Sequence, residues 1–360
     1  MKIIEELKKV FHIDKDKLTI IPGHEGGRNL TILLENPITL IKRVIRISKL
    51  YDRSLEDYEA ELEFVHYLAE NGAAVADVLL SKRGRLCETI YDEEKGEKVV
   101  VSMFQWAVGD QIADHGYQYR PGVPVEEYWY NTDKALGKIH RLAKVYKPVH
   151  KRFDFFDRYN EVYFERMISD QLEGDGIKGD MINFTGKKVK ESLHLLLEKL
   201  RKLPKNQESY GMVHFDYSDG NYNIDYSNGD IHIFDFDNCR TCWYMFDLAN
   251  LWTHGVGWIG WEKDVEKRKS YMERYFSVIL DGYRSETEIS SDILEQLPIM
   301  IQTVLMENII DEFEVQMAEE GRIQCDSEQA YRIKCLVEDI PYMGFFSNIY
   351  DVNHPFQLDE

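Results

Sequence analysis

Residues 213–221 read VHFDYSDGN, and residues 231–237 read IHIFDFD. Together the two segments have the pattern His-x-Asp-x-x-x-x-Asn followed by Asp-Phe-Asp. A site for phosphoryl transfer needs a carboxylate that orients the attacking hydroxyl, and an amide oxygen and a second carboxylate that bind a metal ion. Asp216, Asn221 and Asp235 can supply these three groups, so the pattern predicts a site of this kind.

The sequence between the two segments predicts a β-hairpin. Apolar and polar residues alternate on both sides of Asn228-Gly229, and this dipeptide favours a two-residue type I′ turn, whose central residues both need a positive φ. With that turn, Tyr222 pairs with Asp235, and Asn221 lies about 5 Å from Asp235 across the ladder. Two oxygen ligands at that separation suit one hard cation, Mg²⁺. A surface hairpin with polar ends is the alternative interpretation.

Residues 211–252 resemble the catalytic core of the aminoglycoside phosphotransferase family, whose relatives include choline kinase and the second type of homoserine kinase. The resemblance implies a protein-kinase-like fold, with Asp216 as the catalytic base and with Asn221 and Asp235 as magnesium ligands. It also implies that Asp247, in Asp-Leu-Ala, supports the catalytic loop and does not touch the substrate.

The sequence departs from the kinase pattern at two positions. Asp237 stands where protein kinases have the Gly of Asp-Phe-Gly, which the wider family does not require, and Phe215 replaces the usual Arg or Gly. Only a short stretch separates Asp235 from Asp247, and no Ala-Pro-Glu follows, so the activation segment that positions a peptide is missing. We therefore expect a small-molecule acceptor, with a Ser/Thr protein kinase as a disfavoured alternative.

The N-terminal part predicts strands with a glycine-bearing turn. Residues 18–21 and 30–34 are apolar and flank a turn that contains Gly26, Gly27 and Asn29. Backbone N–H groups in such a turn can bind phosphates, although an ordinary hairpin has the same pattern. In the resembled family this turn covers the nucleotide.

Residues 39–48 predict a strand that carries a phosphate-binding cation. Val44-Ile45-Arg46-Ile47 resembles the Leu-Arg-Ile strand of the family, in which Arg often replaces the Lys of protein kinases. Arg46 is permanently charged and can bind phosphate through two N–H groups at once. Lys42, on the same face of the strand, is the competing candidate, and a solvated strand edge is the alternative.

Residues 54–71 predict a helix, which begins with a capping box formed by Ser54 and Asp57 and ends at Asn71 before a glycine. The resemblance matches Glu61 on this helix to the ion-pair partner of the phosphate-binding residue. The glutamates on either side of Glu61 are expected to face solvent.

Residues 99–104 predict a buried strand, and the segment after it resembles the hinge that binds adenine. Gln105 would offer its C=O group and Ala107 its N–H group. An ordinary junction between a strand and a loop has the same pattern, so this assignment depends on the neighbouring motifs.

These features predict an α+β, two-lobed, protein-kinase-like fold. The N-terminal nucleotide-binding lobe, residues 1–104, would hold an antiparallel sheet and one helix. The larger, mainly helical lobe, residues 105–360, would hold the catalytic and acceptor-binding residues, with a hinge near 104–109. His140, in a Leu-Gly-Lys-Ile-His sequence, is expected to be a hydrogen-bonded core histidine and not a catalyst.

Composition limits the partners and the compartment. The net charge of −20 argues against nucleic acid, which is bound by Lys and Arg. Acidic residues along the whole chain favour solubility, and attraction of a cationic substrate is the second interpretation. We expect a cytoplasmic protein, because the sequence has no run of about 18 apolar residues and its amphipathic, acidic start is unlike a secretory signal.

Cysteines and tryptophans add two weaker hypotheses. The odd number of cysteines, 5, indicates free thiols, and metal or redox use of Cys239 and Cys242 is disfavoured because a lone Cys-x-x-Cys is a weak signal. Trp252, Trp258 and Trp261 can line an acceptor pocket, although core packing is the commoner use. The sequence therefore predicts a kinase that depends on ATP and Mg²⁺. A nucleotide-binding regulatory protein with little turnover is the rival, and the oligomeric state stays open.

Overall fold

The computed structural model describes residues 2–21, 29–51, 53–159, 186–260, 262–320 and 327–339. The chain divides into two compact units. The first unit combines Met1–Asn131, Val145–Phe153 and Asp219–Cys239, and the second combines Thr132–Lys144, Asp154–Ser218 and Arg240–Glu360. The lobe boundary expected near 104–109 stays a prediction.

The first unit contains a six-stranded antiparallel sheet in the order β1-β2-β3-β6-β4, with β5 also paired to β6. Buried apolar residues of these strands pack with helix α1 into one core. A separate hairpin, β8–β9, belongs to the same unit. The elements are α1 (Lys2–Val10), β1 (Lys17–Ile21), β2 (Asn29–Glu35), β3 (Lys42–Lys49), β4 (Val78–Leu79), β5 (Cys87–Asp92), β6 (Glu97–Gln105), β8 (Tyr222–Ile224) and β9 (Ile231–Ile233).

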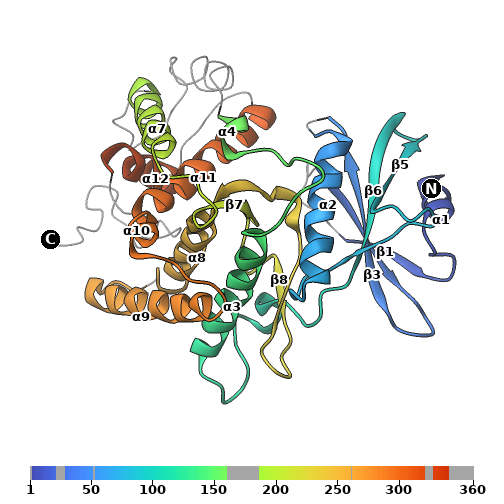
Figure 1. The fold of residues 1–360 in the computed structure, drawn as a ribbon, viewed down its shortest axis with the longest axis horizontal. Helices are drawn as coiled ribbons and strands as arrows, with labels where there is room; N and C mark the ends of the chain where they lie inside the picture. Colours follow the sequence, from blue (N-terminus) through green and yellow to red (C-terminus); the bar gives the residue numbers. More distant parts are fainter. Residues whose placement is uncertain are drawn as a thin grey trace. The chain divides into compact units, whose positions relative to one another are not determined.

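Helix α2 (Leu55–Glu70) lies against this sheet, as Figure 1 shows. Its predicted cap is confirmed: the Ser54 hydroxyl accepts a hydrogen bond from the Asp57 N–H at 3.2 Å, and the Asp57 carboxylate accepts one from the Ser54 N–H at 2.8 Å. The helix ends at Glu70, and Asn71 is its C-cap residue, as predicted. Because capping depends only on neighbouring residues, the sequence alone could locate this helix.

The second unit is mainly helical, with one short two-stranded sheet, β7–β10. Helix α8 supplies much of its core and packs against α9 and α11. Together with the sheet of the first unit, this unit confirms the predicted α+β class. Its elements include the C-terminal part of α3 (Val125–Ala143), α4 (Phe155–Arg158), α7 (Gly186–Arg201), β7 (Tyr210–Val213), β10 (Arg240–Trp243), α8 (Tyr244–Ile259), α9 (Val265–Arg284), α10 (Ser291–Leu294), α11 (Leu297–Glu320) and α12 (Ser327–Glu338).

One helical stretch, Ser291–Gln316, is long and apolar enough to cross a membrane by length and composition alone. However, 67% of its most apolar window is buried inside the protein. Burial of that extent is typical of a helix at the centre of a helical core, where apolar residues are needed on all sides.

Candidate functional site

A buried ion pair links strand β3 to helix α2. Arg46 Nη1 lies 2.7 Å from Glu61 Oε1, and the two side chains are only 7% and 0% exposed. Burial acts to lower the pKa of Arg46, but the charge of Glu61, with smaller contributions from Asp237 and Asp235, raises it above its ordinary value. The guanidinium is therefore always charged, and Glu61 is its ion-pair partner.

The pair leaves hydrogen-bonding groups of Arg46 unused. Among the described residues, Nε and Nη2 of Arg46 are buried and have no hydrogen-bond partner. A buried N–H group without an acceptor is costly, so these two atoms fit an oxygen-rich anion such as phosphate. The competing candidate, Lys42, is exposed and lies over the Trp106 ring, 5.3 Å from its centroid. The structure thus places Arg46, and not Lys42, beside Glu61.

The predicted register of the β8–β9 hairpin is wrong. In the structure Tyr222 pairs with Ile233, and Ile224 pairs with Ile231, which is a shift of two residues from the predicted pairing. Asn221 consequently does not lie opposite Asp235: its carbonyl oxygen accepts a hydrogen bond of 2.9 Å from the N–H of Phe234.

The physical reason is that the turn is longer than two residues. Asn228 does not have a positive φ, whereas Gly229 has a φ of +90°, so a type I′ turn at these two residues does not form. Asp225 closes the loop, because its N–H donates to Asp230 O at 2.9 Å and its side chain accepts from the Ser227 N–H at 2.9 Å. Local Asx hydrogen bonds therefore stabilise a longer loop, residues 226–229.

Asp235 lies at the base of this hairpin with a left-handed backbone, φ 61° and ψ 59°, and its side chain is exposed. The next residues, Phe236 and Asp237, are buried. Asp tolerates the left-handed region better than most residues, so the chain can turn here and leave the carboxylate accessible. Asn221, on the other strand, is half-buried.

Asp237 anchors the turn that follows Asp235. Its carboxylate accepts a hydrogen bond of 2.6 Å from the Asn29 amide and lies 3.6 Å from Arg53 Nη1. Arg53 and Arg152 both donate to the Asp237 carbonyl oxygen. Asn29, expected at the nucleotide, is thus tethered to Asp237, and its own Oδ1 accepts from the Ser48 hydroxyl at 2.7 Å.

The expected adenine-binding segment is held by a residue that we did not predict. Asn223, buried in β8, donates from Nδ2 to the carbonyl oxygens of Ala107 at 2.9 Å and Gly109 at 3.1 Å. The N–H of Gln105 donates to Asp77 O at 2.8 Å. The two hydrogen bonds from Asn223 fix the backbone around Ala107, whose N–H group is predicted to bind adenine. The only sequence signal of Asn223 is a polar residue between two buried strand residues, which does not identify the distant partner.

In the second unit, Asp247 holds the backbone that leads to Asp216. Its carboxylate accepts hydrogen bonds from the N–H groups of His214 at 2.9 Å and Phe215 at 2.8 Å. The same carboxylate lies 3.1 Å from Nε2 of the fully buried His140. Burial lowers the pKa of His140, so this histidine is neutral and Nε2 donates. The supporting role of Asp247 and the core position of His140 agree with the expectation.

The backbone turns sharply at Phe215, just before Asp216. It has a φ of 72°, which is rare for a bulky residue. Its ring stacks on Phe246 with the centroids 4.2 Å apart, and Arg240 lies over it at 3.6 Å. As expected, Phe215 serves packing. Its neighbour Asp216 is exposed although the residues on both sides are buried, so the turn presents the carboxylate.

The remaining candidates contribute less. Gly26, Gly27 and Trp261 lie outside the described residues. Trp252 and Trp258 are half-buried on α8, and Trp252 packs edge-on against Phe276, with the ring centroids 5.2 Å apart.

Cys239 and Cys242 are buried free thiols. Burial raises the pKa of both, that of Cys239 to about 12. Thiols in this state are unreactive, because the thiolate is the reactive form.

Comparisons with known proteins identify the family of this chain. A model of the phosphotransferase enzyme family matches residues 19–287, well over half of the chain. Amicoumacin kinase of Bacillus subtilis (strain 168) is 26% identical over 259 residues, which cover 71% of this chain and 69% of that protein.

Two solved structures show the fold. The amicoumacin kinase hAmiN in complex with AMP-PNP, Ca²⁺ and Ami has a TM-score of 0.76 at 20% identity, with 96% of each chain covered. A microcompartment-associated aminopropanol kinase has a TM-score of 0.63 at 17% identity, with 94% of each chain covered. These likenesses confirm the expected protein-kinase-like fold, and the match over residues 19–287 shows that this chain belongs to the phosphotransferase enzyme family.

Proposed function

We propose that this enzyme transfers the γ-phosphate of ATP to a hydroxyl group of a small, amine-bearing molecule in a reaction that depends on Mg²⁺. The observation that carries the proposal is the buried guanidinium of Arg46, ion-paired to Glu61 while its Nε and Nη2 lack acceptors among the described residues. Phosphate oxygens of a nucleotide would satisfy these atoms. A purely structural ion pair would use its N–H groups within the protein.

The metal ion would bind through Asn221 and Asp235 at the base of the β8–β9 hairpin. Within the described part of the chain, no group of three or more His, Cys, Asp or Glu residues can hold a metal ion by itself. One amide and one carboxylate are few ligands for a hard cation. Mg²⁺ is commonly bound by one or two carboxylates together with substrate phosphates, so the donors present fit a metal that arrives with the nucleotide.

Asp216 would act as the general base. The acceptor oxygen forms a bond to the γ-phosphorus while the bond from that phosphorus to the β–γ bridging oxygen breaks and leaves its electron pair on ADP. The proton of the acceptor hydroxyl passes to the Asp216 carboxylate. Exposure of this side chain, on a backbone held by Asp247, suits a group that must meet an incoming substrate.

Two observations support an acceptor that carries an amine: the net charge of this chain and the name of a structural relative. The chain has a net charge of −20, which attracts cations. A structural relative acts, by its name, on aminopropanol, an amino alcohol. An aminoglycoside or a homoserine-like compound fits the same class. A cytoplasmic location fits the need for ATP and is part of the proposal.

A nucleotide-binding regulatory protein with little turnover is the second candidate. It would retain the nucleotide-contacting Arg46 but would have no use for an exposed carboxylate at position 216. Acceptor-stimulated release of ADP separates the two candidates, because only an enzyme shows it.

The role of Arg46 is tested with the double variant Arg46→Met/Glu61→Leu. Replacing both partners of a buried pair with apolar residues is often neutral for folding, whereas removing one partner leaves a buried charge. We expect the double variant to melt near the wild-type temperature and to bind AMP-PNP about tenfold more weakly, since a hydrogen bond to a charged group contributes about 1.5 kcal/mol. Calorimetric titration measures the affinity. If the double variant bound AMP-PNP as tightly as the wild type, the role assigned to Arg46 would be contradicted.

The matched control is Arg83→Met/Glu88→Leu, which removes a second ion pair of the same unit. Arg83 Nη1 lies 3.1 Å from Glu88 Oε2, and the Arg83 side chain is 63% exposed. This variant should leave AMP-PNP affinity unchanged, so that any general effect of losing an Arg–Glu pair can be subtracted.

A further inference from the structure

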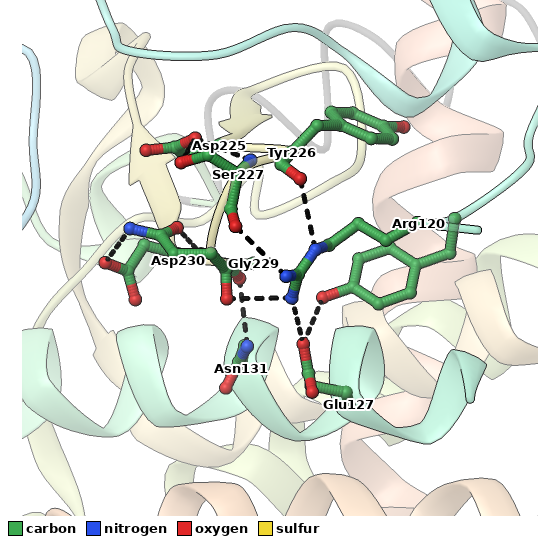
Figure 2. A network of polar contacts seen from close by, with 10 residues as sticks. Arg120, Glu127, Asn131, Asp225, Tyr226, Ser227, Gly229 and Asp230 are labelled. Atoms are coloured by element: carbon green, nitrogen blue, oxygen red, sulfur yellow. Dashed lines mark hydrogen bonds and ion pairs between the residues drawn. The ribbon is translucent and has the colours of Figure 1, made fainter. Parts of the chain in front are cut away.

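The loop of the β8–β9 hairpin is held by a single guanidinium group. Arg120 donates from Nε to the Tyr226 carbonyl at 3.1 Å and from Nη2 to the Ser227 carbonyl at 3.1 Å. Its Nη1 donates to the Asn228 carbonyl at 2.9 Å. As Figure 2 shows, the backbone oxygens of successive loop residues converge on this one side chain.

Helix α3 completes this arrangement. Asn131 donates from Nδ2 to the Gly229 carbonyl at 2.9 Å, and Glu127 Oε1 accepts from Arg120 Nη1 at 2.5 Å and from the Tyr119 hydroxyl at 2.9 Å (Figure 2). Every carbonyl oxygen of residues 226–229 therefore accepts a hydrogen bond from Arg120 or Asn131. We refer to Arg120, Glu127 and Asn131 as the loop clamp.

The loop and the clamp are matched in shape. A Cβ atom added to Gly229 would lie 2.4 Å from the Tyr119 hydroxyl oxygen and 2.8 Å from Glu127 Oε1. Gly229 also has a positive φ of +90°. The positive φ favours glycine at this position, and the short distances show that the loop backbone lies close against Tyr119 and the clamp.

The hairpin has a competing register that its own sequence favours. Asn228-Gly229 is a strong signal for a two-residue turn, in which Tyr222 would pair with Asp235. The observed register differs by two residues. A slip of two residues keeps every side chain on its original face, so burial of the apolar residues does not distinguish the two registers.

The ladder itself is also short, with three residue pairs. One residue of each strand also forms backbone hydrogen bonds with a neighbouring segment. Ile224 exchanges hydrogen bonds with Asp110, and Ile233 exchanges them with residues 74–76. Neither contact involves the loop. Arg120 and Asn131 are the side chains that recognise the longer loop, because in a two-residue turn residues 226 and 227 would belong to the ladder.

The register determines where the proposed metal ligands lie. With the two-residue turn Asn221 would face Phe236, so the slip moves Asp235 by about 7 Å along the strand, from one side of Asn221 to the other, since a strand rises about 3.4 Å per residue. We infer that Arg120 is a positioning residue: by holding the carbonyl groups of residues 226–228 it keeps the hairpin in the observed register, in which Asn221 faces Phe234 and Asp235 lies one residue beyond it. The inference rests on the proposed function, because the consequence is a change in metal-dependent nucleotide binding.

The test is calorimetric titration of the full chain with AMP-PNP, once with Mg²⁺ and once with EDTA. The ratio of the two dissociation constants measures how strongly the metal couples to the nucleotide. For Arg120→Met we expect this ratio to fall about tenfold, as is typical when a group that orients metal ligands is lost. Affinity in EDTA should stay at the wild-type value, because Arg46 is untouched. Arg83→Met, an exposed arginine of the same unit, is the control and should change neither value.

A second substitution separates positioning from simple destabilisation. Asn228→Ser removes the preference for a two-residue turn, because Ser disfavours the left-handed region that this turn requires. In the Arg120→Met background it should therefore raise the ratio again. A wild-type ratio in Arg120→Met, or a further fall on adding Asn228→Ser, would overturn the inference. If the wild-type protein binds AMP-PNP equally with Mg²⁺ and with EDTA, the proposed function itself fails.

Discussion

Replacing Asp216 with Asn should lower turnover by about 10²–10⁴-fold, the usual contribution of a general base. The amide keeps the size of the carboxylate but cannot take the proton of the acceptor hydroxyl. AMP-PNP affinity should stay within about twofold of the wild-type value, because the nucleotide does not need this group for binding. Steady-state assays of ADP release and calorimetric titration measure the two quantities on the same preparation.

Asp281→Asn is the matched control for this substitution. Asp281 is an exposed residue of helix α9 in the same unit as Asp216, so the chemical change is identical but falls outside the predicted site residues. Turnover should be unchanged in the control. Wild-type turnover in Asp216→Asn would show that the carboxylate is not the base, and the interpretation of the His-x-Asp motif would fall.

Replacing Asp235 with Asn should remove most of the stabilisation that MgATP gives to the protein. Asn is preferred over Ala here because Asp235 has a φ of 61°, and Asn tolerates this backbone while Ala adds strain. A ligand at about 100 times its Kd stabilises the folded state by about 2.7 kcal/mol, and a hundredfold loss of affinity reduces this to about 0.4 kcal/mol. Thermal unfolding with and without MgATP measures the difference.

Two controls define this result. Asp14→Asn changes an exposed aspartate of the same unit and should keep the full thermal shift. Unfolding with ATP in EDTA should be the same for Asp235→Asn and wild type. An undiminished shift from MgATP in Asp235→Asn would contradict the assignment of this carboxylate to the metal.

Local signals in the sequence predicted part of the structure well. The capping box of α2 depends on residues three apart, and the structure has it as predicted. The pairing of Arg46 with Glu61 followed from the resemblance, and the structure brings the two side chains together. In both cases the deciding interactions belong to regular elements that are themselves evident from the sequence.

The β8–β9 hairpin shows where such signals fail. Asn228-Gly229 favours a two-residue turn, yet the structure has a longer loop whose carbonyl groups bind Arg120. Arg120 is more than a hundred residues away along the chain, and no short-range pattern reveals the contact. The same holds for Asn223, whose partners Ala107 and Gly109 are equally distant. Tertiary hydrogen bonds therefore act together with the local bonds of Asp225 at the loop, and they hold the backbone of the expected hinge.

The most direct measurement of the central claim is acceptor-dependent formation of ADP from ATP and Mg²⁺. The panel pairs small amine-bearing alcohols and aminoglycosides with matched compounds that lack the amine, and mass spectrometry follows each candidate acceptor. We expect at least one amine-bearing compound to stimulate ADP release and to gain a single phosphoryl group, with the activity lost in Asp216→Asn. Nucleotide binding without stimulation by any compound, or stimulation only by the compounds that lack the amine, would contradict the proposed function.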